Sequence, residues 1–145
     1  MLYGIEPVIG PGVIVKLDDA KKSNYESDFD LWNSIVHDFD IRQIIIDLKN
    51  ADAEAIEVNG YRVVSTTSIT CEGPIIMING NYITPPFTIK AIGDKDALYY
   101  AMYNPDSWYK TMELRGLRLS LKRSDNISVS GINDGIEIKY LKPKK

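Results

Sequence analysis

His37 is the only histidine of the chain, and Asp38 follows it directly. A histidine can act as a general base when a nucleophile lies within hydrogen-bond reach. Cys71 or Ser65 could supply that nucleophile, and the protein would then be a hydrolase. Adjacent side chains do not usually face each other, so the pair indicates a structural role for His37 at the entry to a helix. We predict that the chain is not an enzyme, with a hydrolase that uses His37 as the alternative.

The other reactive residue types lack the partners that metal or cofactor chemistry needs. Cys71 is the only cysteine, so it has no Cys-x-x-Cys partner, and we expect it to be a small buried apolar residue. Gly10-Pro11-Gly12 precedes a strand-like run instead of a helix, and no Gly-Lys-Ser/Thr follows, which excludes a phosphate loop. Asp18-Asp19 lacks the spacing of a calcium loop. We therefore expect neither a metal site nor a cofactor.

Tyrosine and tryptophan side chains form the best candidate surface for a protein partner. These residue types are enriched at protein interfaces, because they combine a large apolar body with a polar tip. The alternative is that they cover the edge of the core. The candidates are Trp32, Tyr99, Tyr103, Trp108 and Tyr109.

Two Asn-Gly pairs predict two β-hairpins. One lies between the β-rich runs 55–58 and 61–64, and the other lies between 75–78 and 81–83. Asn-Gly favours a tight type I′ turn, because both of its central residues need a positive φ. Polar side chains near the hairpin tips could line a cleft for a small ligand, which is the second functional hypothesis. The candidates are Asn59, Arg62, Ser65, Thr67 and Asn79.

Two amphipathic helices should cover the sheet. The first begins at Asp38 or Asp40, which can cap free main-chain N–H groups. Its apolar residues recur at helical spacing, namely Ile41, Ile44, Ile45 and Leu48. The second begins after Asp94 and ends before Asn104-Pro105, with a further helical turn after it. Its expected buried face is Ala97, Leu98, Ala101 and Met102, and the further turn runs through Trp108, Met112 and Leu114.

Short β-rich runs supply the remaining strands, at 13–17, 87–92, 117–122, 127–129 and 136–140. Residues 18–36 are predicted to form a surface loop, and 65–74 a polar connection. The order of elements predicts one α+β domain over residues 1–145. We expect a mostly antiparallel twisted sheet with two helices packed on one face, two projecting Asn-Gly hairpins and a ferredoxin-like outline.

Composition narrows the classes of partner. The 145 residues have a net charge of −3, whereas phosphate binding needs a concentrated basic face, so we expect no nucleic-acid partner. No run of apolar residues is long enough to span a bilayer. The first residues lack the charged start and apolar run of a signal peptide. As given, we expect the chain to be soluble.

Five stretches of the chain occur in the order that is typical of one bacterial family. They are Gly10–Val13 with Leu17-Asp18-Asp19, Val36–Ile41, Ala53–Gly60 with Arg62, Gly73–Ile75 through Asn79-Gly80, and Pro85–Asp94. In this combination the chain resembles the YlxW/YlxX-like family, which is domain of unknown function 881 and is often labelled "division initiation protein". Members usually have Gly where this chain has Asp52, so an aspartate would here take the left-handed conformation that ends the first helix.

The resemblance implies a non-enzymatic scaffold or adaptor linked to cell division or the envelope. Family members typically carry one N-terminal transmembrane helix, a coiled coil and then this domain. We therefore expect the domain on the extracytoplasmic side of a single-pass bacterial membrane protein. Its partners would be division or envelope proteins. The anchor is absent from this chain, and homo-oligomers would form through a coiled coil that is also missing from it.

Overall fold

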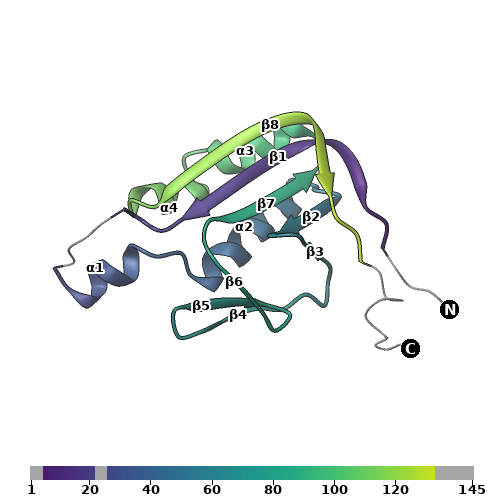
Figure 1. Ribbon diagram of the computed structural model, residues 1–145. Coiled ribbons are helices and arrows are strands. Elements are labelled where there is room, and N and C mark those ends of the chain that lie inside the picture. Colours follow the sequence, from purple (N-terminus) through teal and green to yellow (C-terminus); the bar gives the residue numbers. More distant parts are fainter. Residues whose placement is uncertain (1–4, 22–25, 133–145) are drawn as a thin grey trace, which may run out of the picture.

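The computed structural model describes residues 5–21 and 26–132, which form two antiparallel sheets and four helices (Figure 1). The larger sheet has the strand order β3-β2-β7-β1-β8, and the smaller one has the order β4-β5-β6. The strands are β1 (Val8–Asp18), β2 (Ala55–Val58), β3 (Tyr61–Val63), β4 (Ile69–Glu72), β5 (Ile75–Ile78), β6 (Asn81–Ile83), β7 (Phe87–Ile92) and β8 (Arg118–Val129). The helices are α1 (Asp28–Asn33), α2 (Asp38–Asn50), α3 (Lys95–Tyr103) and α4 (Trp108–Leu114).

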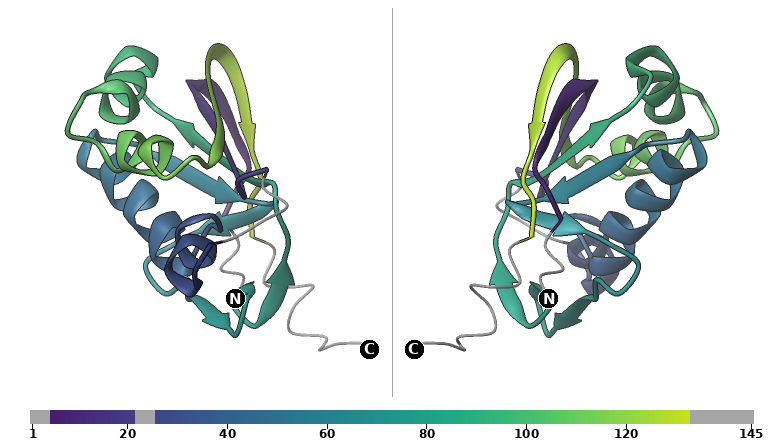
Figure 2. Two further views of the ribbon diagram at one scale, coloured as in Figure 1. Left: turned by 90° about the vertical axis from the view of Figure 1, so that its left-hand side faces the viewer. Right: turned by 90° about the vertical axis from the view of Figure 1, so that its right-hand side faces the viewer.

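Two split βαβ units build the larger sheet. β1 leads through α2 to β2, and β7 lies between these two strands. β7 then leads through α3 to β8, and β1 lies between those two. This is the ferredoxin-like arrangement. The predicted fold class, α+β with a mostly antiparallel sheet, is confirmed, and the helices lie on one side of the sheet (Figure 2).

Alternation along the central strands creates the main core. Val13, Val15 and Leu17 are fully buried, and their partners on β7 are Ala91, Ile89 and Phe87. Successive side chains of a strand point to opposite faces, so all six lie on the face that the helices cover. The apolar stripe predicted for α2 packs onto them in one cluster with Met102 and Met112. Ala97, in contrast, is exposed, so the predicted buried face of α3 was wrong at this position.

The ends of α2 are held by hydrogen bonds to the main chain. At the N-terminus, the Asp40 carboxylate accepts from the His37 N–H at 2.8 Å. At the C-terminus, Asp52 has a φ of 67°, as the comparison with the family pattern predicted. The N–H groups of Asp52 and Ala53 donate to the carbonyls of Lys49 and Leu48. This is a Schellman motif with aspartate in the position that glycine normally occupies.

Both Asn-Gly pairs lie in tight turns with a positive φ at each residue. The first hairpin, β2–β3, extends the larger sheet instead of projecting from it. The second, β5–β6, gains a further partner in β4, which pairs with β5 from Ile69↔Ile78 to Glu72↔Ile75. Residues 65–74, predicted only as a polar connection that ends in a turn, thus also contain a strand. Residues 69–72 form this strand because Ile69 packs into the main core while its neighbours face water.

Two other segments differ from the prediction. The loop expected over 18–36 contains α1, which Ser27 caps by accepting a hydrogen bond from the Asp30 N–H at 3.0 Å. The two strands expected at 117–122 and 127–129 are the single strand β8, which pairs with β1 along its length. The strand expected at 136–140 lies outside the described residues.

The second face of the larger sheet carries only a small apolar cluster. Val8 of β1 and Ile127 and Val129 of β8 pack there with Ile92. The strands approach one another very closely at Gly12, where a Cβ would lie 1.8 Å from the Ala91 carbonyl oxygen. Only glycine fits that position. No helix covers the rest of this face in the described residues, as the views in Figures 1 and 2 agree.

Replacing Asp52 with glycine should stabilise the domain. Aspartate is disfavoured in the left-handed region by its Cβ, whereas glycine is not, so we expect Asp52→Gly to raise the free energy of unfolding by about 0.5–1 kcal/mol. Asp52→Ala should lower it. Urea unfolding followed by circular dichroism measures both changes, and a less stable glycine variant would contradict this explanation of the helix end.

Candidate protein-interaction surface

The corner between α3 and α4 is built by caps and by a proline. Asp94 begins α3 by accepting hydrogen bonds from the N–H groups of Asp96 and Ala97. α3 ends at Tyr103, since Pro105 follows closely and cannot continue a helix. Ser107 then caps α4, and its hydroxyl also donates to the Met102 carbonyl at 2.6 Å. These bonds hold the two helices at a defined corner.

An open groove of about 570 Å³ lies at this corner, and we call it the tyrosine groove. Its most exposed apolar side chains are Leu114 at 90%, Tyr100 at 65% and Tyr103 at 56%. Lys110 and Glu113 form an ion pair of 3.1 Å beside it, and the Lys110 ammonium lies 4.3 Å from the centre of the Tyr103 ring. The complete lining is Tyr100, Tyr103, Asn104, Pro105, Lys110, Glu113 and Leu114.

The structure distributes the predicted aromatic candidates over three environments. Tyr103 lines the groove, and Tyr99 is stacked on it with ring centres 5.7 Å apart. Tyr109 is buried, and burial together with the charge of Glu113 raises its pKa to about 12. Trp108 is half-buried and points into the molecule. Tyr109 and Trp108 therefore contribute mainly to packing inside the domain.

Two residues that make the groove apolar, Tyr100 and Leu114, were not among the candidate partner residues. The sequence prediction placed Leu114 in the same helical turn as Met112 and assigned it no side. Residues two apart on a helix point to nearly opposite sides. Because Met112 is fully buried, Leu114 must point outward. The helical spacing of buried residues, which was used for α2, could have identified Leu114 as exposed if it had been applied to α4.

Asp40 connects the corner to α2. Its fully buried carboxylate accepts hydrogen bonds from Trp108 Nε1 at 2.8 Å and from Arg115 Nη1 at 2.7 Å. The same carboxylate caps α2 through the His37 N–H. A buried carboxylate is tolerated when it is paired and fully hydrogen-bonded. This network fixes α4, and with it the tyrosine groove, against α2.

The His37 ring lies beside two aromatic rings. Its ring lies 4.4 Å from that of Trp32 and 5.1 Å from that of Phe39, and its Nε2 is 2.7 Å from the Trp32 carbonyl oxygen. Within the described residues, no hydrogen bond joins this ring to Cys71 or Ser65. The hydrolase hypothesis thus lacks its contact between nucleophile and base. Trp32 is 46% exposed and is not among the residues that line the groove.

Cys71 is exposed, so the prediction of a buried residue was wrong. In β4 it pairs with Ile76 at the margin of the small sheet, near Asp38 on α2. Partial loss of water around the sulfur and the negative charge of Asp38 raise the pKa of the Cys71 thiol. A nucleophilic cysteine needs the opposite shift.

Most of the polar residues predicted to line a ligand cleft instead form hydrogen bonds to the main chain. The side chain of Asn59 bonds to the main chain of Thr88 and Thr84, and that of Asn79 accepts from the Ser68 N–H. Arg62 donates to main-chain carbonyls. Ser65 and Thr67 line a pocket of about 170 Å³. Ligand pockets commonly have roughly 300–1,000 Å³, so the tyrosine groove is the better candidate site.

Fold and surface together define a ferredoxin-like α+β domain with an added three-stranded sheet and an exposed aromatic groove. The chain belongs to the family described as "Bacterial protein of unknown function (DUF881)", whose model matches residues 1–142. This finding confirms the family resemblance. Within the described residues, no helix is both long and apolar enough to span a membrane.

The chain is similar to several bacterial proteins. It is 32% identical over 133 residues to the UPF0749 protein YlxW of Bacillus subtilis, covering 91% of this chain and 56% of that protein. It is 30% identical over 138 residues to the UPF0749 protein Rv1823 of Mycobacterium tuberculosis, covering 91% and 43%. The chain thus spans about half the length of these relatives.

One solved structure shares the fold. It is the crystal structure of an uncharacterized conserved protein from Mycobacterium tuberculosis, with a TM-score of 0.73 and 24% sequence identity. The likeness covers 97% of this chain and 87% of that one. It supports the ferredoxin-like fold with its added sheet.

Removing the Asp40 carboxylate should strongly destabilise the domain. In Asp40→Ala the Arg115 guanidinium and the Trp108 indole N–H lose their acceptor, and we expect a loss of about 3–5 kcal/mol in the free energy of unfolding. Urea unfolding followed by tryptophan fluorescence measures it. Asp47→Asn on the same helix is the control and should change stability little. A loss from Asp40→Ala as small as that of the control would show that the network does not hold α4.

Cys71 should react slowly with alkylating reagents near neutral pH. Because its pKa is raised, the alkylation rate should rise at a higher pH than for a free cysteine. Asp38→Asn removes a negative charge and should shift the rate profile to lower pH, while Asp47→Asn should leave it in place. The measurement is the rate of iodoacetamide labelling against pH, and an unchanged profile in Asp38→Asn would contradict the assigned cause.

Proposed function

We propose that this domain is a non-enzymatic interaction module that binds an apolar segment of a protein partner in the tyrosine groove. The observation that carries the proposal is the exposure of Tyr100, Tyr103 and Leu114 around one hollow. Large apolar side chains gathered on a surface commonly mark a protein interface. Tyrosine is well suited to such a role because it contributes large contact area while ordering few rotatable bonds.

The surroundings of the groove support a protein ligand over a small molecule. The hollow is open to solvent and bordered by the Lys110–Glu113 ion pair, which gives it an apolar centre with a charged rim. Interfaces between proteins have this anatomy. The two walls come from α3 and α4, whose corner is held by Ser107 and by the Asp40 network. A preformed groove loses little conformational entropy on binding.

We extend the proposal to the bacterial envelope. In this proposal an N-terminal anchor and a coiled coil outside this chain carry the domain on the extracytoplasmic side of the cell membrane. The groove there recruits a division or envelope protein. The support is the family resemblance and the greater length of the bacterial relatives, of which this chain spans about half.

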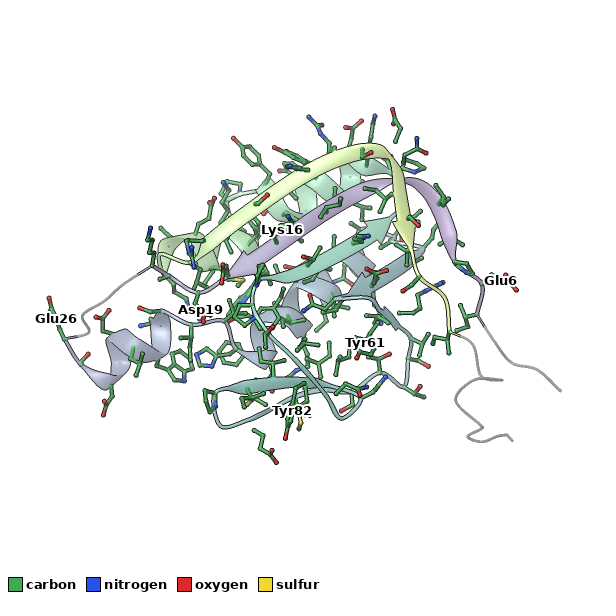
Figure 3. The ribbon with its side chains drawn as sticks, in the orientation of Figure 1. Glu6, Lys16, Asp19, Glu26, Tyr61 and Tyr82 are labelled. Carbon is green, nitrogen blue, oxygen red and sulfur yellow. The ribbon has the colours of Figure 1, made fainter. Side chains whose placement is uncertain are left out.

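The test is affinity capture from a detergent extract of the producing bacterium's membranes, with captured proteins identified by mass spectrometry. The groove variant is Tyr100→Gln combined with Leu114→Gln, two exposed side chains whose loss should leave the core intact. The matched control is Tyr82→Gln, an exposed aromatic on the small sheet (Figure 3).

We expect the immobilised domain to retain an envelope or division protein. The groove variant should weaken that retention by about tenfold or more, as loss of central interface residues does, and the control should not. Equal retention by the groove variant would reject the groove as the binding surface. Recovery of soluble metabolic enzymes alone would contradict the envelope role.

A further inference from the structure

The uncovered face of the larger sheet gathers three lysines from three strands. Strand register places Ile14 of β1 opposite Lys90 of β7 on one side and opposite Lys122 of β8 on the other. Residues paired in register on neighbouring strands point to the same face. Lys16 lies two residues along β1, so it shares this face. Figure 3 shows Lys16 on the sheet face that is turned toward the viewer, with the helices behind.

The cations of this face, which we call the lysine face (Lys16, Lys90 and Lys122 around Ile14), are largely available. Lys16 and Lys122 are exposed and make no ion pair or hydrogen bond within the described residues. Lys90 lies 3.9 Å from the mostly buried Glu57 carboxylate and 3.4 Å from the Ser128 carbonyl oxygen. The face is therefore positive in a chain whose net charge is −3.

Hydroxyl groups and one aliphatic side chain complete the face. Thr88 and Ser120 are the register partners of Lys16, so each lies beside it on the same side of the sheet. Both are half-buried, and a hydroxyl can donate a hydrogen bond to a carboxylate. Half-buried Ile14 supplies an apolar contact at the centre of the three lysines.

We propose that the lysine face binds an extended acidic segment of a partner protein. Carboxylates at alternate positions of an extended chain point the same way and are about 7 Å apart. That is also the separation between the row of Lys90 and Lys122 and the row of Lys16 along β1. One extended segment lying along β1 therefore brings its carboxylates to the lysine ammonium groups in succession, with Ile14 between them.

Two other anionic partners fit this face less well. Nucleic acid would need aromatic side chains on which bases can stack, and the register positions around Ile14 hold none. A broad anionic membrane would also meet the acidic residues at both ends of the face, where Figure 3 places Glu6 at one side and Asp19 and Glu26 at the other. An extended segment that stops short of both ends of β1 avoids these repulsive charges, and Asp18, which shares the face with Lys16, is paired with Arg118 at 3.2 Å.

This inference rests on the proposed role as an interaction module, but it concerns a surface separate from the tyrosine groove. The groove lies on α3 and α4, which cover the opposite face of the sheet. The groove can fail to capture a partner protein while the lysine face still binds an acidic segment. The groove can equally capture its partner while the lysine face binds nothing. The two proposals are therefore tested by different variants and different probes.

The experiment uses the complete chain and a fluorescent glutamate oligomer of about ten residues, which spans roughly 33 Å when extended. Fluorescence anisotropy measures binding over a series of salt concentrations. The test variant is Lys16→Glu combined with Lys122→Glu. The control is Lys49→Glu combined with Lys21→Glu, which changes the net charge by the same amount as the test variant. Both of these lysines are exposed and lie outside the lysine face. Thermal unfolding verifies that all three proteins are folded.

We expect salt-sensitive binding that the test variant weakens by about tenfold or more and the control by about twofold at most. Equal losses in the two variants would show a general charge effect and overturn the assignment. Absence of binding to the glutamate oligomer would overturn it as well. Binding only to vesicles of phosphatidylglycerol, or only to single-stranded DNA, would assign the face to a membrane or to nucleic acid and reject the acidic segment.

Discussion

The buried carboxylate of Asp40 is the interaction on which the rest of the molecule depends. One side chain with no exposed surface caps α2, accepts the indole N–H of Trp108 and pairs with Arg115. Arg115 in turn donates to the carbonyls of Asn33 and Ile35. A charge removed from water must keep all its partners, so α2, α4 and the chain between α1 and α2 hold one relative position.

The position of α4 against α2 determines which side chains line the tyrosine groove. With Trp108 tied to Asp40 and Met112 buried, the helical phase of α4 leaves Leu114 pointing into solvent beside Tyr100 and Tyr103. The aromatic residues of the corner therefore divide into two kinds. Trp108 and Tyr109 stabilise the fold, and Tyr100 and Tyr103 remain available for binding. Residue type alone does not separate the two kinds, because Tyr109 belongs to the first kind and Tyr100 and Tyr103 belong to the second.

Local patterns allowed most of the fold to be predicted. The alternation of Val13, Val15 and Leu17 and the helical stripe of α2 each show which side is buried, and the family pattern placed Asp52 in the left-handed region. β4 was missed because its pairing with β5 is decided by packing of Ile69 into a core built from distant residues. α1 was missed because it buries no residue, so it has no apolar periodicity to detect.

Surface chemistry was harder to predict for a related reason. A net charge of −3 argues against a basic surface only when charges of both signs are evenly mixed in space. Strand register overrides that assumption here, since it brings together Lys16, Lys90 and Lys122 from distant parts of the chain. The helices cover the apolar residues on one face of the sheet, and outside the small apolar cluster the alternate positions on the other face carry mainly polar side chains. A two-layer α+β fold thus creates its charged face by the same alternation that creates its core.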